Sequence, residues 1–253
     1  MMSTIVAVIV LFSTFGGALL GMAIRARLPE SHLDKDSKEV IGVATGLLAA
    51  LAALVMGLLV ASAKAEFDAQ EAGFQELAAN IVLLDSMLAH YGPETADARV
   101  ALKGAVATMI LRIFPNERHD SSGLKSTEIT TQGNRVYAAI RNLTPHDDAQ
   151  RTVQEQMLQT SADVARTRWL LSEEHDSASL LPFVVVLVIW LTVIFVSFGL
   201  FAPPNAAVVA TLLVCALSTA IAVLLIVDLN WPAAGIIQIT STPLRFAESQ
   251  LGR

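Results

Sequence analysis

Four uninterrupted apolar runs constrain this chain more than any other feature. Every run is at least 20 residues long and contains no Asp, Glu, Lys or Arg; the runs are residues 5–24, 40–63, 180–202 and 206–227. A helix needs roughly 20 predominantly apolar residues to cross the hydrocarbon core of a bilayer. The hydrophobic share of 54% and the charged share of 16% also depart from a soluble globular domain. The sequence therefore predicts a membrane protein with four transmembrane helices.

The four spans are grouped as two hairpins around a polar insert. The first hairpin occupies residues 1–63 and the second occupies residues 180–228. Residues 64–179 have an ordinary soluble composition and form an extramembrane insert. The tail, residues 229–253, is too apolar to be free, so we expect it to lie in the membrane interface or to pack on the insert.

The insert shows the periodicity of helices. Apolar residues recur at a 3-4 spacing in residues 64–91, which follow the second span without a breaker, so one long helix is predicted to leave the bilayer. Gly92 ends this helix, and Pro93 opens the next. Period-two alternation is not sustained anywhere in the sequence, so no sheet is predicted. The predicted fold class is an all-α membrane protein, with four transmembrane helices in two hairpins that flank a helical insert.

The second half of the insert is predicted from turn and capping residues. Residues 115–134 are polar and rich in Gly, Ser and Thr, which predicts a loop. Residues 135–143 are predicted to form a short helix. Thr144 is then expected to cap a last helix that runs to about His175.

Small residues recur in the first two spans. Ser13, Gly17 and Gly21 suit close packing against another helix, and we expect the first run to be a retained span rather than a signal peptide. In the second span, six small residues fall within about 100° of one helical face; they are Gly42, Gly46, Ala50, Ala53, Gly57 and Ala61.

Two interpretations of this second-span face stay open. It is either a packing seam between helices or the lining of a pore between subunits, because small side chains leave width and an apolar lining can gate by dewetting. The pore hypothesis assigns the lining to Gly46, Ala50, Ala53 and Gly57. Lys64, Glu66 and Asp68 follow the span directly, and in a symmetric oligomer each would become a ring of charge; the pore hypothesis assigns Lys64 and Glu66 to the pore mouth. The alternative for these charges is an interfacial anchor and a solvated helix start.

Residues for catalysis or ligand chemistry are not apparent. The chain has no Gly-x-Ser-x-Gly, no His-Glu-x-x-His and no phosphate-binding glycine loop. The first loop is rich in possible cation ligands but lacks the glycine and distal glutamate of an EF-hand; they are Glu30, His32, Asp34, Asp36 and Glu39. We predict no catalytic residue, no cofactor and no metal site, and the net charge of −6 argues against nucleic acid. Asp228, at the edge of the fourth span, is expected to reach water.

Several short motifs, taken in order, resemble the bacterial bestrophin-like domain family. They are Leu28-Pro29-Glu30 with His32-Leu33, Ser62-Ala63-Lys64, Leu84-Asp85, Tyr91-Gly92-Pro93-Glu94-Thr95 with Arg99, Phe198-Gly199-Leu200-Phe201-Ala202-Pro203 with Asn205, and Ser241-Thr242-Pro243-Leu244-Arg245. Bestrophins are pentameric anion channels with four spans, cytosolic termini and a cytosolic helical domain. The chain departs from them in two ways. The second span has no aromatic residue, and from Asp228 to the end of the sequence the acids are only Asp228 and Glu248, so we assign neither a neck residue nor a calcium site.

The resemblance implies a homo-oligomeric ion channel in which the second span lines the pore. It implies an anion as the conducted ion and a pentamer as the assembly. The alternative is a non-conducting membrane scaffold or accessory protein whose insert binds a partner. The expected partners are the lipid bilayer, other copies of the chain and inorganic ions. Four Lys and Arg residues lie near the span ends on each side of the membrane, so their number does not decide the orientation. The resemblance alone places the protein in a bacterial inner membrane, with the insert and both termini in the cytoplasm.

Overall fold

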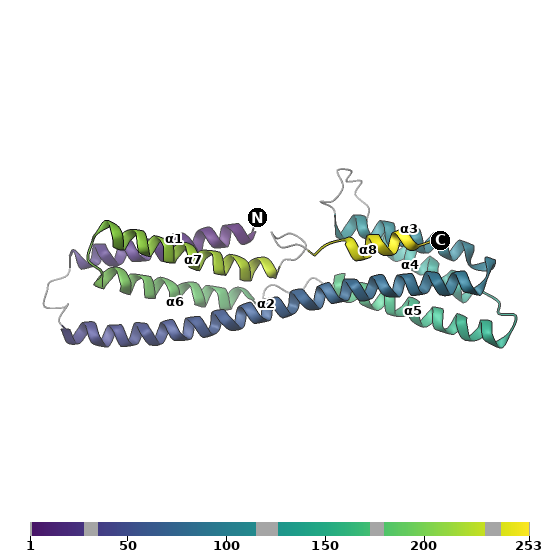
Figure 1. The fold of residues 1–253 in the computed structure, drawn as a ribbon, viewed down its shortest axis with the longest axis horizontal. Helices are drawn as coiled ribbons and strands as arrows, with labels where there is room; N and C mark the ends of the chain where they lie inside the picture. The colour runs from purple at the N-terminus through teal and green to yellow at the C-terminus, as the bar shows by residue number, and fades with distance from the viewer. Residues whose placement is uncertain (1, 28–34, 115–125, 173–179, 231–238, 253) are drawn as a thin grey trace. The chain divides into compact units, whose positions relative to one another are not determined.

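A computed structural model describes residues 2–27, 35–114, 126–172, 180–230 and 239–252. The described residues contain helices and short connections, with no strand (Figure 1). In chain order the helices are α1 (Met2–Arg25), α2 (Lys35–Tyr91), the 3₁₀ turn η2 (Pro93–Thr95), α3 (Ala96–Ile113), α4 (Ser126–Arg141), α5 (Asp148–Ser172), α6 (Leu180–Phe201), α7 (Ala206–Leu229) and α8 (Thr242–Gln250).

Four of these helices are long and apolar enough to cross a membrane. The segments are Ser3–Arg25, Lys38–Tyr91, Leu181–Phe201 and Ala206–Leu229. They contain the four apolar runs of the sequence almost completely, and they are joined by a helical segment. The predictions of four spans and of an all-helical fold are therefore confirmed.

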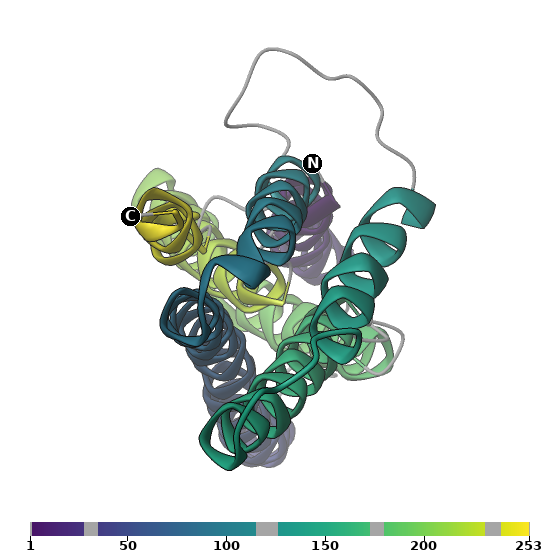
Figure 2. The ribbon, with the colours of Figure 1, turned by 90° about the vertical axis from the view of Figure 1, so that its right-hand side faces the viewer.

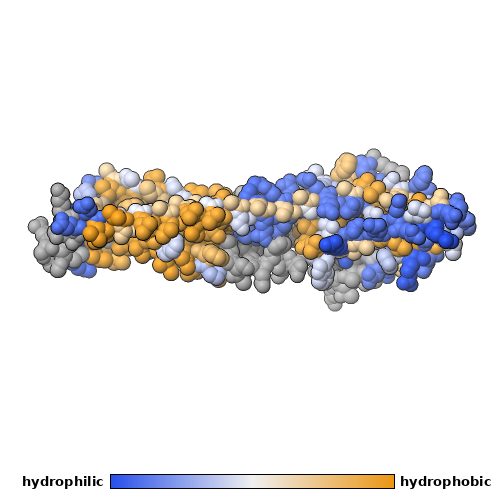
Figure 3. Space-filling model, turned by 90° about the horizontal axis from the view of Figure 1, so that it is seen from below, coloured by the Kyte–Doolittle hydropathy of each residue, from blue (hydrophilic) through white to orange (hydrophobic). Residues whose placement is uncertain are grey.

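The chain divides into two compact units. The membrane unit comprises Met1–Phe67 and His175–Gln238, and the insert unit comprises Asp68–Glu174 and Ile239–Arg253. Helix α2 contributes to both units because it continues without a break from Lys35 to Tyr91, as the sequence predicted. Figure 3 looks onto the α2 side of the membrane unit, the lower edge in Figure 1, and the surface there is almost wholly apolar.

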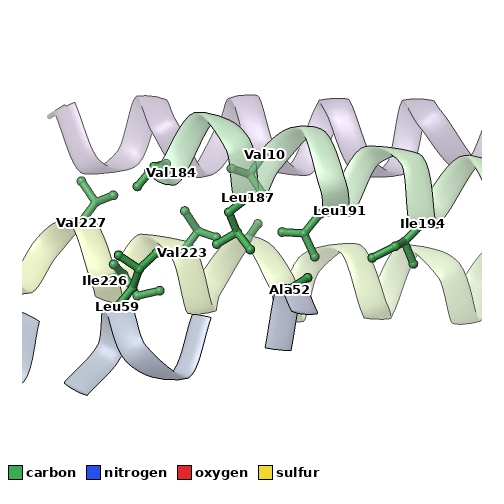
Figure 4. Close-up of a cluster of buried hydrophobic side chains, with 11 residues drawn as sticks. Val10, Ala52, Leu59, Val184, Leu187, Leu191, Ile194, Val223, Ile226 and Val227 are labelled. Atoms are coloured by element: carbon green, nitrogen blue, oxygen red, sulfur yellow. The ribbon is translucent and has the colours of Figure 1, made fainter. Parts of the chain in front are cut away.

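The core of the membrane unit lies between α1, α6 and α7. Val10 of α1, Leu187 of α6 and Val223 of α7 are completely buried and belong to one hydrophobic cluster. Helix α2 reaches this cluster with Ala52 and Leu59 (Figure 4). The burial of branched side chains from three helices thus fixes α1, α6 and α7 as a bundle, with α2 packed along one side.

Helices α1 and α6 approach each other at backbone distance because glycines lie where they cross. A Cβ atom added to Gly21 would overlap the carbonyl oxygen of Val196, and one added to Gly199 would overlap that of Ala18. A Cβ at Gly17 would lie 3.2 Å from the carbonyl oxygen of Thr192. The predicted close packing of the first span is confirmed for Gly17 and Gly21.

Arg25 closes the same end of the bundle. Its Nη1 donates hydrogen bonds to the carbonyl oxygens of Phe201 and Ala202, at 3.1 and 2.5 Å. These carbonyls lie at the C-terminus of α6, where backbone acceptors have no partner within the helix and the dipole favours a cation. Arg25 therefore caps α6 and ties the turn of the second hairpin to the end of α1.

The insert unit is a helical bundle built on the last part of α2. Leu77, Ile81 and Leu88 of α2 are completely buried, as are Ile140 of α4 and Met157 of α5. Figure 2 shows these helices nearly end-on, with α4 and α8 on opposite sides of α3. Helix α3 therefore contacts α4 and α8 in addition to α2, to which Arg99 joins it.

Gly92 separates α2 from α3, as predicted. Its φ of 140° is readily adopted only by glycine, so the α2 helix ends there. The Thr95 hydroxyl then donates a hydrogen bond to the carbonyl oxygen of Leu88, at 2.5 Å. This bond satisfies one of the acceptors left without a partner at the end of α2.

The insert differs from the sequence prediction in two places. The loop predicted for residues 115–134 is wrong from Ser126 onwards, where α4 begins; residues 115–125 lie outside the described residues. The helix predicted for residues 135–143 is confirmed up to Arg141, with Val136 and Ile140 buried, and it extends towards the N-terminus through residues whose Gly and Thr content suggested a loop. The predicted Thr144 cap is also wrong, because the Asp147 carboxylate accepts a hydrogen bond from the Gln150 amide, at 2.6 Å, and so caps α5.

A carboxylate joins three elements of the insert unit. Asp85 of α2 is 6% exposed and accepts two hydrogen bonds from the Arg99 guanidinium of α3, both at 2.9 Å. The amide of Gly252, after α8, donates to the same carboxylate at 3.2 Å. Burial raises the pKa of Asp85, but these hydrogen bonds and the charges of Arg99 and Lys103 outweigh burial, so the pKa lies below its ordinary value of 3.8.

The α1–α6 contact predicts opposite effects for two glycines of one helix. Gly21→Ala should lower the thermal midpoint of the purified protein, because its Cβ overlaps α6 and overpacking costs about 1–3 kcal/mol. Gly16→Ala is the matched control, since no described atom lies within 4 Å of its added Cβ. It should leave the midpoint unchanged or raise it, because Ala favours a helix by up to about 1 kcal/mol. Equal shifts for the two variants would contradict the close contact.

The pKa of Asp85 predicts a dependence of stability on acid pH. A carboxylate whose pKa is lower in the folded state stabilises the fold above its unfolded pKa and loses that contribution as pH falls through the folded value. The thermal midpoint of the wild type should therefore fall towards that of Asp85→Asn below about pH 4. Circular dichroism melts between pH 3 and pH 7 would measure this. Asp97→Asn, an exposed acid of α3, is the control and should retain the wild-type pH dependence.

Candidate functional site

Within the membrane unit, α2 has three distinct faces. The first face packs against the rest of the unit through Ala52 and Leu59, which are 2% and 9% exposed. Partly buried neighbours support it; they are Leu48, Ala49, Val55 and Met56. The remaining two faces do not enter a core.

The small-residue face of α2 lies on the outside of the membrane unit. Gly46, Ala50, Ala53 and Gly57 are all exposed. No described atom lies within 4 Å of a Cβ added to Gly46 or Gly57, and the same holds for Gly42. Gly21 of α1 and Gly199 of α6 are filled by each other's helix backbone, whereas Gly42, Gly46 and Gly57 in the membrane unit's part of α2 meet none of the described residues. The small-residue face is therefore a surface that none of the described helices covers.

A leucine face is the third face of α2. Around the helix it lies between the small-residue face and the face that packs against the core. Its members are between 42% and 64% exposed; they are Leu47, Leu51, Leu54 and Leu58. Branched apolar side chains suit contact with lipid tails, whereas small residues let another backbone approach or leave space. The two exposed faces thus differ in the surroundings that they fit.

Lys64 and Glu66 do not share a face of α2. The helix is continuous through both residues, and a separation of two residues turns it by about 200°. Lys64 has the phase of the small-residue face, and its Nζ lies 5.4 Å from the centroid of the Phe67 ring. Glu66 is half-buried on the side of Leu59. Of the two, Lys64 follows the small-residue face along the helix, and so does the exposed Asp68, which lies four residues further on the same side of α2.

A groove borders one end of the small-residue face. It has a volume of about 390 Å³ and lies between α2, the last part of α6 and the start of α7. Its lining includes Gly42 and Gly46 on one side and Ser197 and Phe198 on the other. Sequence reasoning missed this groove, although the missing side chains at the two glycines are what open it.

The remaining predicted positions have mixed outcomes. Glu30, His32 and Asp34 lie outside the described residues, and the described part of the chain holds no cluster of three His, Cys, Asp or Glu side chains that could bind a metal. The expectation that Asp228 reaches water was wrong, because it is 1% exposed. Asp228 lies in the last turn of α7, where Ile226 and Val227 are also buried, so its carboxylate is enclosed.

The sequence matches the model of the Bestrophin-like domain over residues 12–244, which is most of the chain. The chain belongs to the bestrophin-like family. Comparison with curated proteins and with solved structures found no match. The bestrophin-like match covers all four candidate spans in whole or in part and the helical segment between them, and it agrees with a location in the membrane.

Proposed function

We propose that this protein is a homo-oligomeric ion channel of the bacterial inner membrane in which the small-residue face of α2 lines the conduit. The observation that carries the proposal is the contrast between two sets of helical glycines. Gly21 and Gly199 are filled by a neighbouring backbone, whereas Gly46 and Gly57 have no described neighbour within 4 Å. Family membership supports the same function, with an anion as the transported ion, a pentamer as the assembly, and the insert and both termini in the cytoplasm.

The chemistry of the α2 faces favours this arrangement over the reverse one. If the leucine face surrounded the axis, bulky side chains from every subunit would meet there and close the path. Small residues at the axis leave width for hydrated ions, and the leucines then face lipid or a neighbouring subunit. The apolar lining would still form a barrier that opens and closes by wetting.

The first charged side chain beyond this face is a cation, and it supports the choice of an anion. Lys64 has the phase of the small-residue face, whereas Glu66 lies nearly opposite to it; Asp68 shares the phase of Lys64 but lies one turn further from the span. A ring of Lys64 side chains would raise the local concentration of anions at the mouth of the conduit. A non-conducting scaffold does not need a ring of charge in line with the small-residue face, because the small residues would then serve only as a contact between copies.

The conduit predicts a steep effect of side-chain size at Ala53. Ala53→Leu should reduce anion flux into proteoliposomes by at least about tenfold, because one larger side chain enters the path from every subunit. The oligomer should stay intact in size-exclusion chromatography with light scattering. Ala44→Leu is the matched control: it is the same change at an exposed position about 180° away on the same helix, and it should leave the flux within about twofold of wild type.

Two results would contradict the conduit. If Ala53→Leu dissociates the oligomer, the small-residue face is a packing seam, because overfilling a helix contact costs about 1–3 kcal/mol. If the reconstituted wild type carries no anion or cation current across the tested voltages and pH values, the scaffold is the better function.

The position of Lys64 predicts a change of ion preference. Lys64→Glu should move the reversal potential under a salt gradient towards the equilibrium potential of the cation, since a ring of negative charge attracts cations. Glu66→Lys is the matched control, because its side chain lies on the other side of α2 and should move the potential much less. Planar bilayer recordings would measure both. If the two variants shift the reversal potential by equal amounts in opposite directions, the side of α2 that carries the charge has no effect on ion preference.

A further inference from the structure

The insert unit contains a cavity of about 330 Å³ that the channel function does not use. Its lining comes from α2, α3, α4 and α5, all within the insert unit. Protein interiors leave few voids larger than a water molecule. A volume of this size is instead at the lower end of small-molecule sites, which span about 300–1,000 Å³.

The floor of the cavity is apolar and buried. Ile81 and Leu84 of α2 and Leu102, Val106 and Met109 of α3 line it, and each is at most 5% exposed. None of these side chains offers a hydrogen-bond donor. The floor therefore favours a hydrocarbon group over water.

The polar residues of the lining lie mainly at its rim. Asn134 and Tyr137 of α4 are exposed, and Arg168 of α5 is half-buried. The Nη1 atom of Arg168 lies against α4 at Gly133, where an added Cβ would come within 3.3 Å of it. The absence of a side chain at Gly133 thus lets the guanidinium lie close to the α4 backbone at the edge of the cavity.

Water does not suit this lining. A volume of about 330 Å³ corresponds to roughly ten waters at about 30 Å³ each, and an ordered buried water makes about three hydrogen bonds. Among the described residues, the polar side chains of the lining are Ser161 and the three rim residues Asn134, Tyr137 and Arg168. An occupant with an apolar part for the floor and a polar part for the rim satisfies the cavity better.

We propose that this cavity binds a small amphiphilic anion, a medium-chain alkyl carboxylate. Its chain occupies the floor formed by α2 and α3, and its carboxylate lies at the rim beside Arg168. Guanidinium groups bind carboxylates through two parallel hydrogen bonds, which gives this head group an advantage over a neutral one. The site is separate from the small-residue face of α2 and adds a soluble ligand to the protein's partners.

The test uses the full chain in lipid nanodiscs and decanoate that carries a photoreactive diazirine near its methyl end. After irradiation, mass spectrometry should find the label on α3 peptides that contain Leu102–Met109. Unlabelled decanoate should suppress this labelling, and decanol should compete at least about tenfold less well, because it lacks the charge. Labelling confined to the membrane spans would overturn the proposal.

Two pairs of variants locate the site. Arg168→Gln should weaken decanoate competition at least about tenfold, whereas Arg166→Gln, an exposed arginine of the same helix outside the lining, should leave it within about twofold. Ala165→Phe fills the rim from an exposed position and should abolish labelling of α3, whereas Ala149→Phe should not. Helical circular dichroism would verify that the variants are folded.

The source of the alkyl chain is the last arm of the test. Native mass spectrometry of the protein should release a fatty acid mass, and this mass should be lost in Ala165→Phe. A phospholipid mass that is lost in the same variant would overturn the proposal of a free carboxylate. Equal labelling of α3 in wild type and Ala165→Phe would show that the cavity is not the site.

Discussion

The backbone contact between α1 and α6 is the constraint on which the arrangement of the membrane unit depends. Apolar side chains gain little from leaving lipid for another helix, so spans associate through close packing. Gly21 and Gly199 provide that packing by removing the side chains that would hold the backbones apart. Helix α7 completes this bundle, and α2 packs along it with one face only. In the most apolar window of the second span 11% of the residues are buried, against 28–33% in the other three spans. The bundle thus leaves α2 as the span with the most surface for lipid or for other copies.

The main features of the fold could be predicted from the sequence because two strong physical limits act on it. The thickness of the hydrocarbon core sets the length of each apolar run, and unpaired backbone groups are too costly there for anything but helices. The first half of α4 was missed because its Gly, Ser and Thr residues are typical of loops. It continues the predicted helix that holds the buried Val136 and Ile140, and the packing of these two residues is visible only once the neighbouring helices are placed. The α5 cap was misplaced for a related reason, since Thr144 and Asp147 are both good caps and only the geometry decides between them.

The candidate site could be predicted only in part. The sequence shows which residues of α2 share a face but not what that face meets, because a partner from another chain leaves no mark on one chain's packing. The same small-residue spacing has opposite outcomes in two spans: Gly21 is filled by α6, and Gly57 is not filled by any described residue. Treating Lys64 and Glu66 as one pair ignored the turn of the helix between them, which a continuous α2 makes unavoidable. The groove beside Gly46 was missed because its other wall comes from α6, far away in the sequence.

In the proposed channel, ion selectivity has to come from the ends of the conduit and from its width. Residues 40–63 contain no charged side chain, so no ring of charge within the hydrocarbon region can replace the water around an ion. A bare ion in an apolar constriction is costly, and an ion therefore passes only where the path is wide enough to stay wet. Small residues on α2 provide that width without favouring either sign of charge. Discrimination between anions and cations is then left to charged residues just outside the span. Lys64 and Asp68 both lie in line with the small-residue face, and Lys64 is the one nearer the span.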